Sequence, residues 1–199
     1  MKKLLICLTG ASGAIYGQRL LGWLAKVQAG TIQTREPIGK LDVAWVASKH
    51  AEQVWAEELS EPIPAMEQVT NGLRRWSNSD FSAPFASGSN PPDAVIVAPC
   101  SMSSLARVAQ GGGHELIDRS CQVALKERRP LILMIRETPL SHIHLRNMML
   151  AAEAGATILP AIPAFYSGIN TIEQAVDTVL MRALDHVGIH VPLVQRWGE

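Results

Sequence analysis

The chain has 199 residues, of which 47% are apolar, and its 18 basic side chains equal its 18 acidic side chains in number. This composition suits one globular domain over residues 1–199 with a sizeable buried core. A balanced charge without a run of Lys or Arg argues against a nucleic acid or a membrane surface as partner.

The first segment runs from an apolar stretch, KKLLICL, directly into a glycine-rich turn, TGASGAIYG. Gly10, Gly13 and Gly17 permit a tight turn and a close approach to a ligand, and Ser12 supplies a hydroxyl where a helix begins. The free amides and the dipole of a helix start favour an anion. The segment lacks the Lys of an ATPase loop, and no acidic residue closes the second apolar run, which disfavours NAD. We expect a nucleotide or flavin phosphate here; the alternative is a plain strand-to-helix turn.

Five apolar runs rich in β-branched residues alternate with segments of helical character. Their continuous hydrophobicity indicates strands buried on both faces, as in a parallel sheet covered by helices. This order predicts an α/β fold, namely a three-layer, doubly wound parallel sheet that is flavodoxin-like or Rossmann-like. The runs lie at 4–8, 43–47, 94–99, 131–135 and 156–163, and helices are predicted over 13–27, 49–59, 116–128, 142–153 and 171–186, the last capped by Thr171.

Two stretches interrupt this alternation. Residues 28–40 are polar and predict a surface loop, while residues 62–92 are rich in Ser, Asn, Pro and Gly. A long irregular segment inside a compact domain is usually functional or mobile. We expect the second stretch to cover a site or to contact another subunit.

The cysteines and histidines give no sign of a disulfide framework or a metal site. Cys7, Cys100 and Cys121 are scattered and odd in number, and His142 and His144 are spaced so that a helix would point them to different faces. No apolar run is long enough to span a membrane, and LLICL is short for a signal peptide. We therefore expect a metal-free cytoplasmic protein.

Polar residues follow every predicted strand. In an open parallel sheet the carboxyl ends of the strands form the ligand-binding edge, so these endings are expected to lie together. Arg136 can bind a phosphate or a carbonyl through its planar fork, and Glu137 is a candidate acid or base; the alternative is a solvated ion pair at a strand end. The endings read TGAS, SK, PCSMSS, RETP and PAFY, and they supply the hydroxyls of Ser12, Ser48, Ser101, Ser103 and Ser104.

The segment ALKERRPLILMIRETPLSHIHLRNM, followed by GATILPAIPAFY, carries a family resemblance together with GASGAIYG, SK, ASGS and PCS. Over nearly the whole chain, and in this order and spacing, it resembles the UbiX-type flavin prenyltransferases. The resemblance implies a flavodoxin-like enzyme that joins a dimethylallyl group from dimethylallyl phosphate to N5 and C6 of reduced FMN. It further implies a homo-oligomer, usually a dodecamer with sites between subunits, whose product, prenylated FMN, serves UbiD-type decarboxylases.

The resemblance also implies roles for individual residues. Glu137 and Glu58 match acidic residues of the family, Glu58 being expected to reach a neighbouring subunit's site, and Phe81 falls where relatives carry a tryptophan. The FMN contacts implied are Gly10, Ala11, Ser12, Ser48, Ser101, Met102, Ser103, Ser104 and Arg136, and the ligands of the prenyl phosphate are Lys126, Tyr166, Arg182 and Arg119. The stretch GGGHELIDR departs from relatives that often carry asparagines there, which affects fine flavin contacts.

This set of residues suits metal-independent transfer. A monophosphate leaves easily only if cations and a phenol neutralise its developing charge, and the chain lacks a DDxxD pair for Mg²⁺. Phe81, Tyr166 and Trp197 are expected to face the allylic cation. Without the resemblance, solvated cations at Lys126, Arg119 and Arg182 and a packing role for Trp197 would be the simpler interpretation.

Two alternatives from other classes stay open at this point. One is a flavin-dependent cysteine decarboxylase of the related homo-oligomeric flavoprotein family, which needs a catalytic histidine and an Asn-rich loop. His50 is the candidate histidine here, and the loop reads PCSMSS instead. The other is a non-catalytic flavin-binding or assembly protein, in which Glu137→Gln and Lys126→Ala would leave function unchanged.

Overall fold

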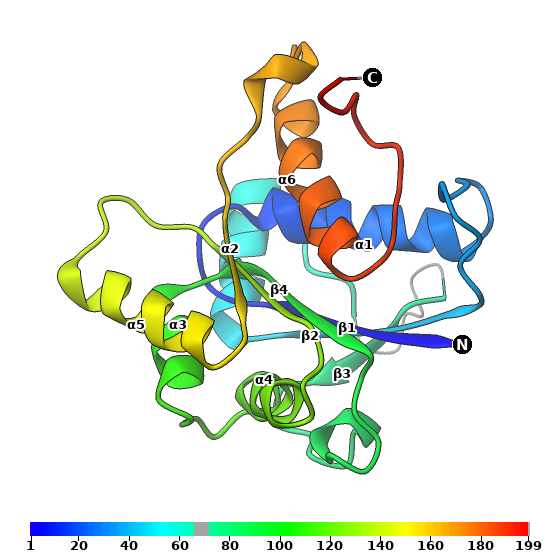
Figure 1. Cartoon of the computed structure of the whole chain (residues 1–199). Coiled ribbons are helices and arrows are strands. Elements are labelled where there is room, and N and C mark those ends of the chain that lie inside the picture. Colours follow the sequence, from blue (N-terminus) through cyan, green and yellow to red (C-terminus); the bar gives the residue numbers. More distant parts are fainter. Residues whose placement is uncertain (66–71, 199) are drawn as a thin grey trace.

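The computed structural model describes residues 1–65 and 72–198 of the chain, and Figure 1 shows its elements. The strands in this part are β1 (Lys2–Leu8), β2 (Leu41–Ala47), β3 (Arg74–Ser77), β4 (Ala94–Cys100), β5 (Leu131–Ile135) and β6 (Thr157–Pro160). The helices are α1 (Ala14–Gln28), α2 (Lys49–Leu59), α3 (Met102–Ala109), α4 (Leu116–Lys126), α5 (His142–Glu153) and α6 (Ile172–His186), with short 3-10 turns η1 (Pro84–Ala86) and η2 (Phe165–Ser167).

All the paired strands run parallel, in the order β3-β2-β1-β4-β5-β6. Without the short edge strand β3, the order is that of a flavodoxin-like sheet, and β3 extends it to the Rossmann-like order. The direction of winding reverses between β1 and β4. In such sheets the crevice beyond the strand ends at this reversal is the place where ligands bind. The predicted fold class is confirmed.

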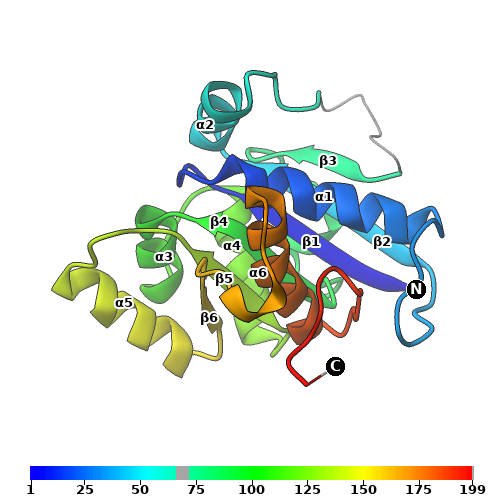
Figure 2. The same cartoon turned by 90° about the horizontal axis from the view of Figure 1, so that it is seen from above.

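Alternate residues of each strand feed two separate cores, which makes the three layers. Leu4 and Ile6 point into the core beneath α1, α2 and α6, whereas Leu5 and Cys7 point into the core beneath α3, α4 and α5. The two layers of helices are visible on opposite sides of the sheet in Figures 1 and 2. Every residue of β4 is buried, as continuous hydrophobicity predicts for a central strand.

The helix starts follow their capping residues. Thr171 accepts a hydrogen bond from the Gln174 amide at 3.2 Å, so the predicted cap of α6 is confirmed. Ser141 caps α5 in the same way, and both positions form capping boxes. Ser48 caps α2 as well, and the bounds of these capped helices match the predicted ranges for α2 and α5 and nearly do for α6; α1 and α4, which have no side-chain cap, begin within one residue of the predicted starts.

Two elements were absent from the sequence prediction. Helix α3 was missed because PCSMSS was interpreted only as a strand ending, although Ser101 is a cap and Met102, Leu105 and Val108 recur at helical spacing on its buried face. Strand β3 was missed because its four residues, RRWS, form no apolar run inside the stretch predicted to be irregular. Residues 66–71 of that stretch lie outside the described part.

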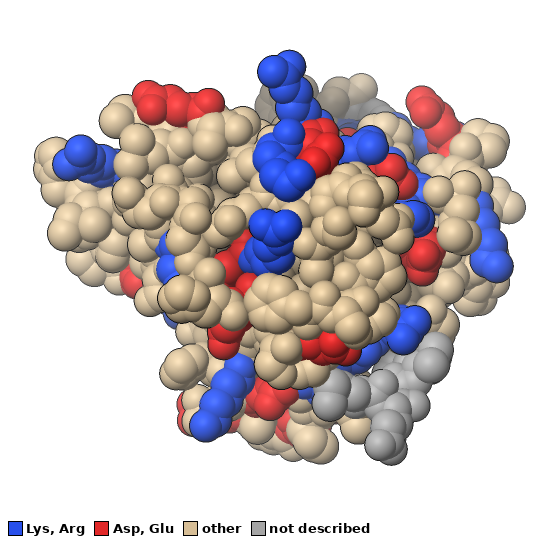
Figure 3. Space-filling model, turned by 90° about the horizontal axis from the view of Figure 1, so that it is seen from below, with Lys and Arg blue, Asp and Glu red and all other residues tan. Residues whose placement is uncertain are grey.

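Charged side chains of both signs are mixed on the face of the molecule seen in Figure 3, where they are interspersed among neutral ones. Within residues 1–65 and 72–198, none of the helices combines the length and apolar character needed to cross a bilayer.

Candidate active site

The loop between β1 and α1 is held close to the start of α2. A Cβ placed on Gly10 would lie 2.4 Å from the Cβ of His50, so only glycine fits this approach. Gly13 has φ 106° and precedes α1 without a side-chain cap. The first amides of α1 therefore need an acceptor from elsewhere.

Glu58, near the end of α2, supplies that acceptor. Its carboxylate accepts hydrogen bonds from the amides of Gly13, at 2.8 Å, and Ala14, at 2.7 Å. Although partial burial opposes ionisation, bonds from the Ser12 hydroxyl and from these amides, together with the charge of Arg136, hold the pKa of Glu58 below its ordinary value. Within the single chain Glu58 thus contacts its own glycine loop, and its reach to a neighbouring subunit's site stays a prediction.

Arg136 contacts the same glycine loop from the other side of the point between β1 and β4 where the winding reverses. It follows β5 directly, and its Nε donates to the carbonyl oxygen of Ser12 at 2.9 Å. Glu137, the next residue, is exposed and accepts a hydrogen bond from the Thr138 amide at 3.0 Å. Arg136 and Glu137 therefore lie at the ligand-binding edge, as the sequence predicted for strand endings, and Glu58 reaches the same glycine loop from α2.

Helices α2 and α3 begin at the same edge, each capped by a predicted serine. Ser48 accepts from the Ala51 amide at 3.1 Å, and Ser101 accepts from the Ser104 amide at 3.3 Å. The buried Thr9 fixes the spacing of the loops, because its hydroxyl accepts from the Ser101 amide and donates to the Pro99 carbonyl, both at 2.8 Å. Thr9 went unnoticed in the sequence, since a hydroxyl next to a glycine loop has no distinctive spacing.

These elements enclose a cavity of about 470 Å³ beyond the ends of β1, β2 and β4. Its volume lies within the range of small-molecule sites, about 300–1,000 Å³. A second cavity, of about 440 Å³, adjoins it, shares His114 and Glu115, and includes Phe81 and Lys49. The first cavity is lined by Gly10, Ser48, His50, Ser101, Ser103, Ser104, Arg107, His114, Glu115 and Asp118.

An ion pair that sequence reasoning missed forms one wall of this cavity. Asp118 is 1% exposed and accepts from Arg107 Nε at 2.9 Å, while Arg107 also donates to the hydroxyl of Ser104 at 3.1 Å. Gly113, at φ 117°, is needed beside it, because a Cβ there would lie 2.3 Å from Asp118 Oδ2. The pair orients Ser104, one of the predicted flavin contacts. Its only sequence signal was the departure of GGGHELIDR from the family pattern.

Two predicted phosphate ligands lie on the α6 side of the sheet. Tyr166, in η2, packs edge-on against Trp197 with ring centroids 5.2 Å apart. Arg182, on α6, is largely exposed and lies 3.5 Å from Asp185. The structure therefore brings Tyr166 and Trp197 together, whereas Phe81, the third residue predicted for the aromatic wall, lies beside the second cavity.

The other two predicted phosphate ligands lie on α4, on the opposite face of the sheet. Lys126 ends α4 and pairs with Glu127, beside Gly88 of the ASGS loop. Arg119 donates from Nε to the carbonyl of Ala86 at 2.9 Å. Since Lys126 precedes β5 by only a few residues, it lies at the amino edge of the sheet. Lys126 therefore does not belong to the strand endings of its own chain, and its role as a phosphate ligand stays a prediction that the resemblance implies.

The remaining predicted site residues differ in how far they are exposed. Ala11 and Met102 are buried at the starts of α1 and α3, while Ser12 and Ser103 are exposed at the edge. Phe81 is half exposed beside the second cavity. Among the residues described, no group of three or more His, Cys, Asp or Glu side chains is arranged to hold a metal ion.

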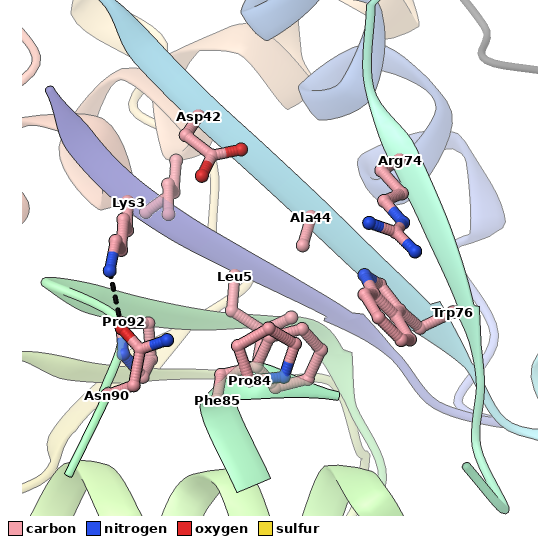
Figure 4. A pocket seen from close by; sticks show the side chains of 11 residues that line it. Lys3, Leu5, Asp42, Ala44, Arg74, Trp76, Pro84, Phe85, Asn90 and Pro92 are labelled. Carbon is pink, nitrogen blue, oxygen red and sulfur yellow. Dashed lines mark hydrogen bonds between the residues drawn. The ribbon is translucent and has the colours of Figure 1, made fainter. Parts of the chain in front are cut away.

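A separate groove of about 220 Å³ lies over the face of β1, β2 and β3 (Figure 4). Ala44 and Leu5 form its floor, Trp76 and Phe85 pack edge-on at 5.9 Å, and the Arg74 guanidinium lies 4.0 Å from the Trp76 ring centroid. It shares no lining residue with the two cavities at the strand ends.

A parallel sheet with hydroxyl-bearing helix starts at its reversal point is the architecture of a flavin-binding α/β protein. Accordingly, residues 1–184 match the family model "Flavoprotein". The flavin prenyltransferase UbiX of Pseudomonas aeruginosa is 39% identical, covering 100% of this chain and 95% of that protein, and the UbiX of Methanocaldococcus jannaschii is 40% identical, covering 98% of each. The chain belongs to the UbiX flavin prenyltransferase family.

Solved structures agree with this assignment. AnUbiX, crystallised with FMN and dimethylallyl pyrophosphate, superposes with a TM-score of 0.84 at 36% identity, covering 100% of this chain and 98% of that one. A dodecameric FMN-dependent UbiX-like decarboxylase from Escherichia coli O157:H7 has the same TM-score at 35% identity, covering 99% of each. The cysteine decarboxylase TvaF reaches 0.60 at 18% identity, covering 94% of this chain and 99% of that one, which is a likeness of fold alone.

Proposed function

We propose that this protein is a flavin prenyltransferase, which joins the dimethylallyl group of dimethylallyl phosphate to N5 and C6 of reduced FMN. The observation that carries the proposal is the meeting of two serine-capped helix starts, the Gly10 loop and Arg136 at the reversal point of the sheet, in a chain of the UbiX family. Its cavity suits a flavin with a phosphate tail in volume and in donors.

The flavin end of the site rests on residues that the chain itself brings together. The hydroxyls of Ser48, Ser101 and Ser104 and the helix-start amides suit an anion and polar ring edges, and Arg136 suits an electron-rich carbonyl. Ala11 and Met102 would contact the ring through their backbone and apolar atoms. The Arg107–Asp118 ion pair would hold Ser104 in its orientation.

The prenyl-phosphate end requires more than one subunit. Lys126 and Arg119 lie on one face of the sheet, and Tyr166 and Arg182 lie on the other. In an assembly, the first pair from one subunit and the second pair from another would surround one phosphate. Their cations and the phenol would neutralise the charge that develops on the leaving group, without a metal ion.

An exposed apolar surface on and beside α5 supports such an assembly. Ile143 is 71% exposed and Met149 is 56% exposed on a helix that buries only Asn147 and Ala151. Apolar surface of this kind marks sites of protein association. We therefore propose a homo-oligomer, and a dodecamer in view of the E. coli O157:H7 neighbour.

The reaction breaks the bond between C1 of the prenyl group and the phosphate oxygen, and it forms a bond from C1 to N5 of reduced flavin. Inorganic phosphate leaves with the electron pair. N5 gives up its proton as its bond to C1 forms. For ring closure a proton adds to the prenyl double bond, C6 attacks the cationic carbon so formed, and the proton lost from C6 passes to a base. Glu137 and Glu58 are the candidate bases, since both carboxylates lie at the strand-end edge. Phe81, Tyr166 and Trp197 would face the allylic cation.

The direct test incubates the purified protein with reduced FMN and dimethylallyl phosphate, with a chelator and no divalent metal, and measures the mass of the flavin. We expect a mass gain of one C5H8 unit, lost in Lys126→Ala and Arg182→Ala. FMN that stays unmodified with both the mono- and the diphosphate donor, although bound, would overturn the proposal. Unchanged activity in Lys126→Ala and Glu137→Gln would instead favour a non-catalytic flavin protein.

Subunit mixing tests the shared site. Lys126→Ala and Arg182→Ala subunits, each inactive alone, are co-expressed, and the mixed assembly is assayed. If the two residues of a site come from different subunits, about a quarter of the sites in a random mixture regain both. A mixture as inactive as either parent would show that one subunit supplies both residues.

The cysteine decarboxylase alternative now has only a distant likeness in its favour. His50 lines the cavity, but the loop that follows β4 carries serines and no asparagine. Delivery of prenylated FMN to a UbiD-type decarboxylase is part of the proposal, and it is tested by the activation of such an apo-decarboxylase with the product.

A further inference from the structure

The segment after α6 returns along that helix and ends beside η2, as Figure 1 shows. At its end, the indole of Trp197 packs edge-on against Tyr166, with ring centroids 5.2 Å apart and an interplanar angle of 88°. Trp197 is nevertheless 79% exposed, so this one contact does not fix the segment by burial. Something else must hold the two rings together.

Asp185, in the last turn of α6, provides the strongest anchor for this segment. Both of its oxygens accept from Arg196, Oδ2 from Nη1 at 2.8 Å and Oδ1 from Nη2 at 2.6 Å, which is a bidentate pair. His190 Nδ1 lies 3.0 Å from Oδ1. The Asp185 side chain is only 11% exposed and that of Arg196 only 21%. The pair is therefore partly desolvated, and it lies one residue before Trp197.

A second tie joins the same two segments. The Ser167 hydroxyl donates to the carbonyl of Gln195 at 3.0 Å. On the other side of η2, the buried hydroxyl of Thr178 accepts from the Ala164 amide at 3.1 Å. The loop that carries Tyr166 is thus fixed to α6 at its start and to the C-terminal segment at its end.

The same carboxylate is within reach of Arg182, a proposed phosphate ligand. Arg182 Nη1 lies 3.5 Å from Asp185 Oδ2, the longest contact that this carboxylate makes with an arginine. The side chain of Arg182 is 56% exposed, in contrast with that of Arg196. Since Arg196 occupies both carboxylate oxygens, Asp185 holds Arg182 only weakly, and its guanidinium stays accessible to an anion.

We propose that Asp185 and Arg196 form a latch that positions Trp197 against Tyr166 and leaves Arg182 available for the prenyl phosphate. Both are positioning residues: Asp185 contacts Arg182, Arg196 acts on Tyr166 through the adjacent Trp197, and neither touches the substrate itself. The inference rests on the proposed function for the identity of the substrate. The latch itself rests only on the contacts above.

The test compares Arg196→Ala, Arg196→Lys and Asp185→Asn with the wild type, and with Lys40→Ala, an exposed cation outside α6, η2 and the C-terminal segment. We measure KM for dimethylallyl phosphate, kcat, and FMN affinity by flavin fluorescence. Arg196→Ala is expected to raise this KM about tenfold or more, with FMN affinity unchanged, because a bidentate charged pair is lost. Arg196→Lys restores part of the loss, Asp185→Asn also raises KM, and Lys40→Ala changes nothing.

Combination with Trp197→Ala separates positioning from general destabilisation. If the latch acts through Trp197, adding Arg196→Ala to Trp197→Ala raises KM by much less than Arg196→Ala does in the wild type. Full additivity contradicts the latch. A normal KM in Asp185→Asn together with a raised KM in Arg196→Ala also contradicts the latch. In that case the higher KM of Arg196→Ala would arise only because Asp185, freed from Arg196, binds Arg182.

Hydrogen exchange judges the latch without relying on activity. In Arg196→Ala, the amides of residues 164–168 and 193–198 are expected to exchange faster together, while the rest of the chain exchanges as before. Faster exchange with an unchanged KM, or unchanged exchange, overturns the inference. A wild-type protein that prenylates no flavin defeats the proposed function, and the exchange result then still decides whether the latch exists.

Discussion

The carboxylate of Glu58 lies 2.7 Å from the backbone amide of Ala14 and so occupies the anion-binding start of α1. This position is the one that the glycine-rich sequence reserves for a negative charge, and the chain fills it with its own side chain. The contact links the end of α2 to the beginning of α1. It also places a proposed catalytic base next to Arg136, whose charge helps to hold the pKa of Glu58 down.

The first prediction concerns acid stability. Because the pKa of Glu58 is lowered in the folded chain from 4.5, its ionised form stabilises the fold, fully above that pH and progressively less as pH falls through the folded value. Chemical denaturation at pH values from about 6 to about 3 is therefore expected to show a flatter pH dependence in Glu58→Gln than in the wild type. Since the side chain is exposed, the change is below about 1 kcal/mol.

Glu57→Gln is the matched control for that experiment, since Glu57 is adjacent, exposed and makes no such contact with the start of α1. It should follow the wild-type pH dependence. Identical curves for wild type and Glu58→Gln would show that the helix start does not hold the carboxylate in solution.

The second prediction contrasts two glycine substitutions of opposite sign. Gly10→Ala places a methyl group 2.4 Å from the Cβ of His50, which forces β1 and α2 apart. We expect a loss of about 1–3 kcal/mol in the free energy of unfolding and weaker FMN binding. Gly22→Ala, in the interior of α1 with nothing within 4 Å, is expected to stabilise by roughly 0.5–1 kcal/mol and to leave FMN binding unchanged. Equal effects of the two variants would contradict the close approach at Gly10.

The sequence was most informative where local chemistry decides the structure. Continuous apolar runs predicted five of the described strands, and Thr171 predicted the start of α6, because burial on both faces and side-chain caps depend on residues close in the chain. Strand β3 was not predicted because its pairing with β2 determines it, and its own residues, RRWS, show no strand pattern. Edge strands are determined by their neighbours more than by their own hydrophobicity.

The site was predictable in part, for a similar reason. Serines and Arg136 at strand ends follow from the rule for parallel sheets, and the structure places them around one edge. The rule does not apply to Lys126, because this residue ends a helix at the opposite edge of the sheet and its proposed role depends on another subunit. Asp118 was missed because its partner Arg107 lies on a helix that the sequence analysis did not recognise.

The third prediction separates the two roles of a capping serine. Ser101→Ala removes the acceptor of the Ser104 amide at the start of α3 and should cost about 1 kcal/mol of unfolding free energy. Ser141→Ala removes a similar cap, with the His144 amide at 3.2 Å, and should cost a similar amount. Only Ser101→Ala is expected to weaken FMN binding, because Ser101 lines the strand-end cavity and Ser141 does not. Titration of flavin fluorescence decides this, and equal affinity in both variants would remove Ser101 from the flavin contacts.

The fourth prediction concerns the interface between α1, which follows the glycine loop, and α6, which carries Arg182. Asp177 is 4% exposed and accepts from Arg19 at 2.8 and 2.6 Å and from the indole of Trp23 at 2.9 Å. Asp177→Ala leaves a partly buried guanidinium and an indole N–H without this acceptor, so we expect a loss of about 3 kcal/mol, measured as a lower denaturant midpoint. Asp177→Asn keeps a neutral acceptor and should lose less. If both variants are as stable as the wild type, the charged contact does not contribute to holding α1 against α6, and the apolar packing of the core that the two helices share must suffice.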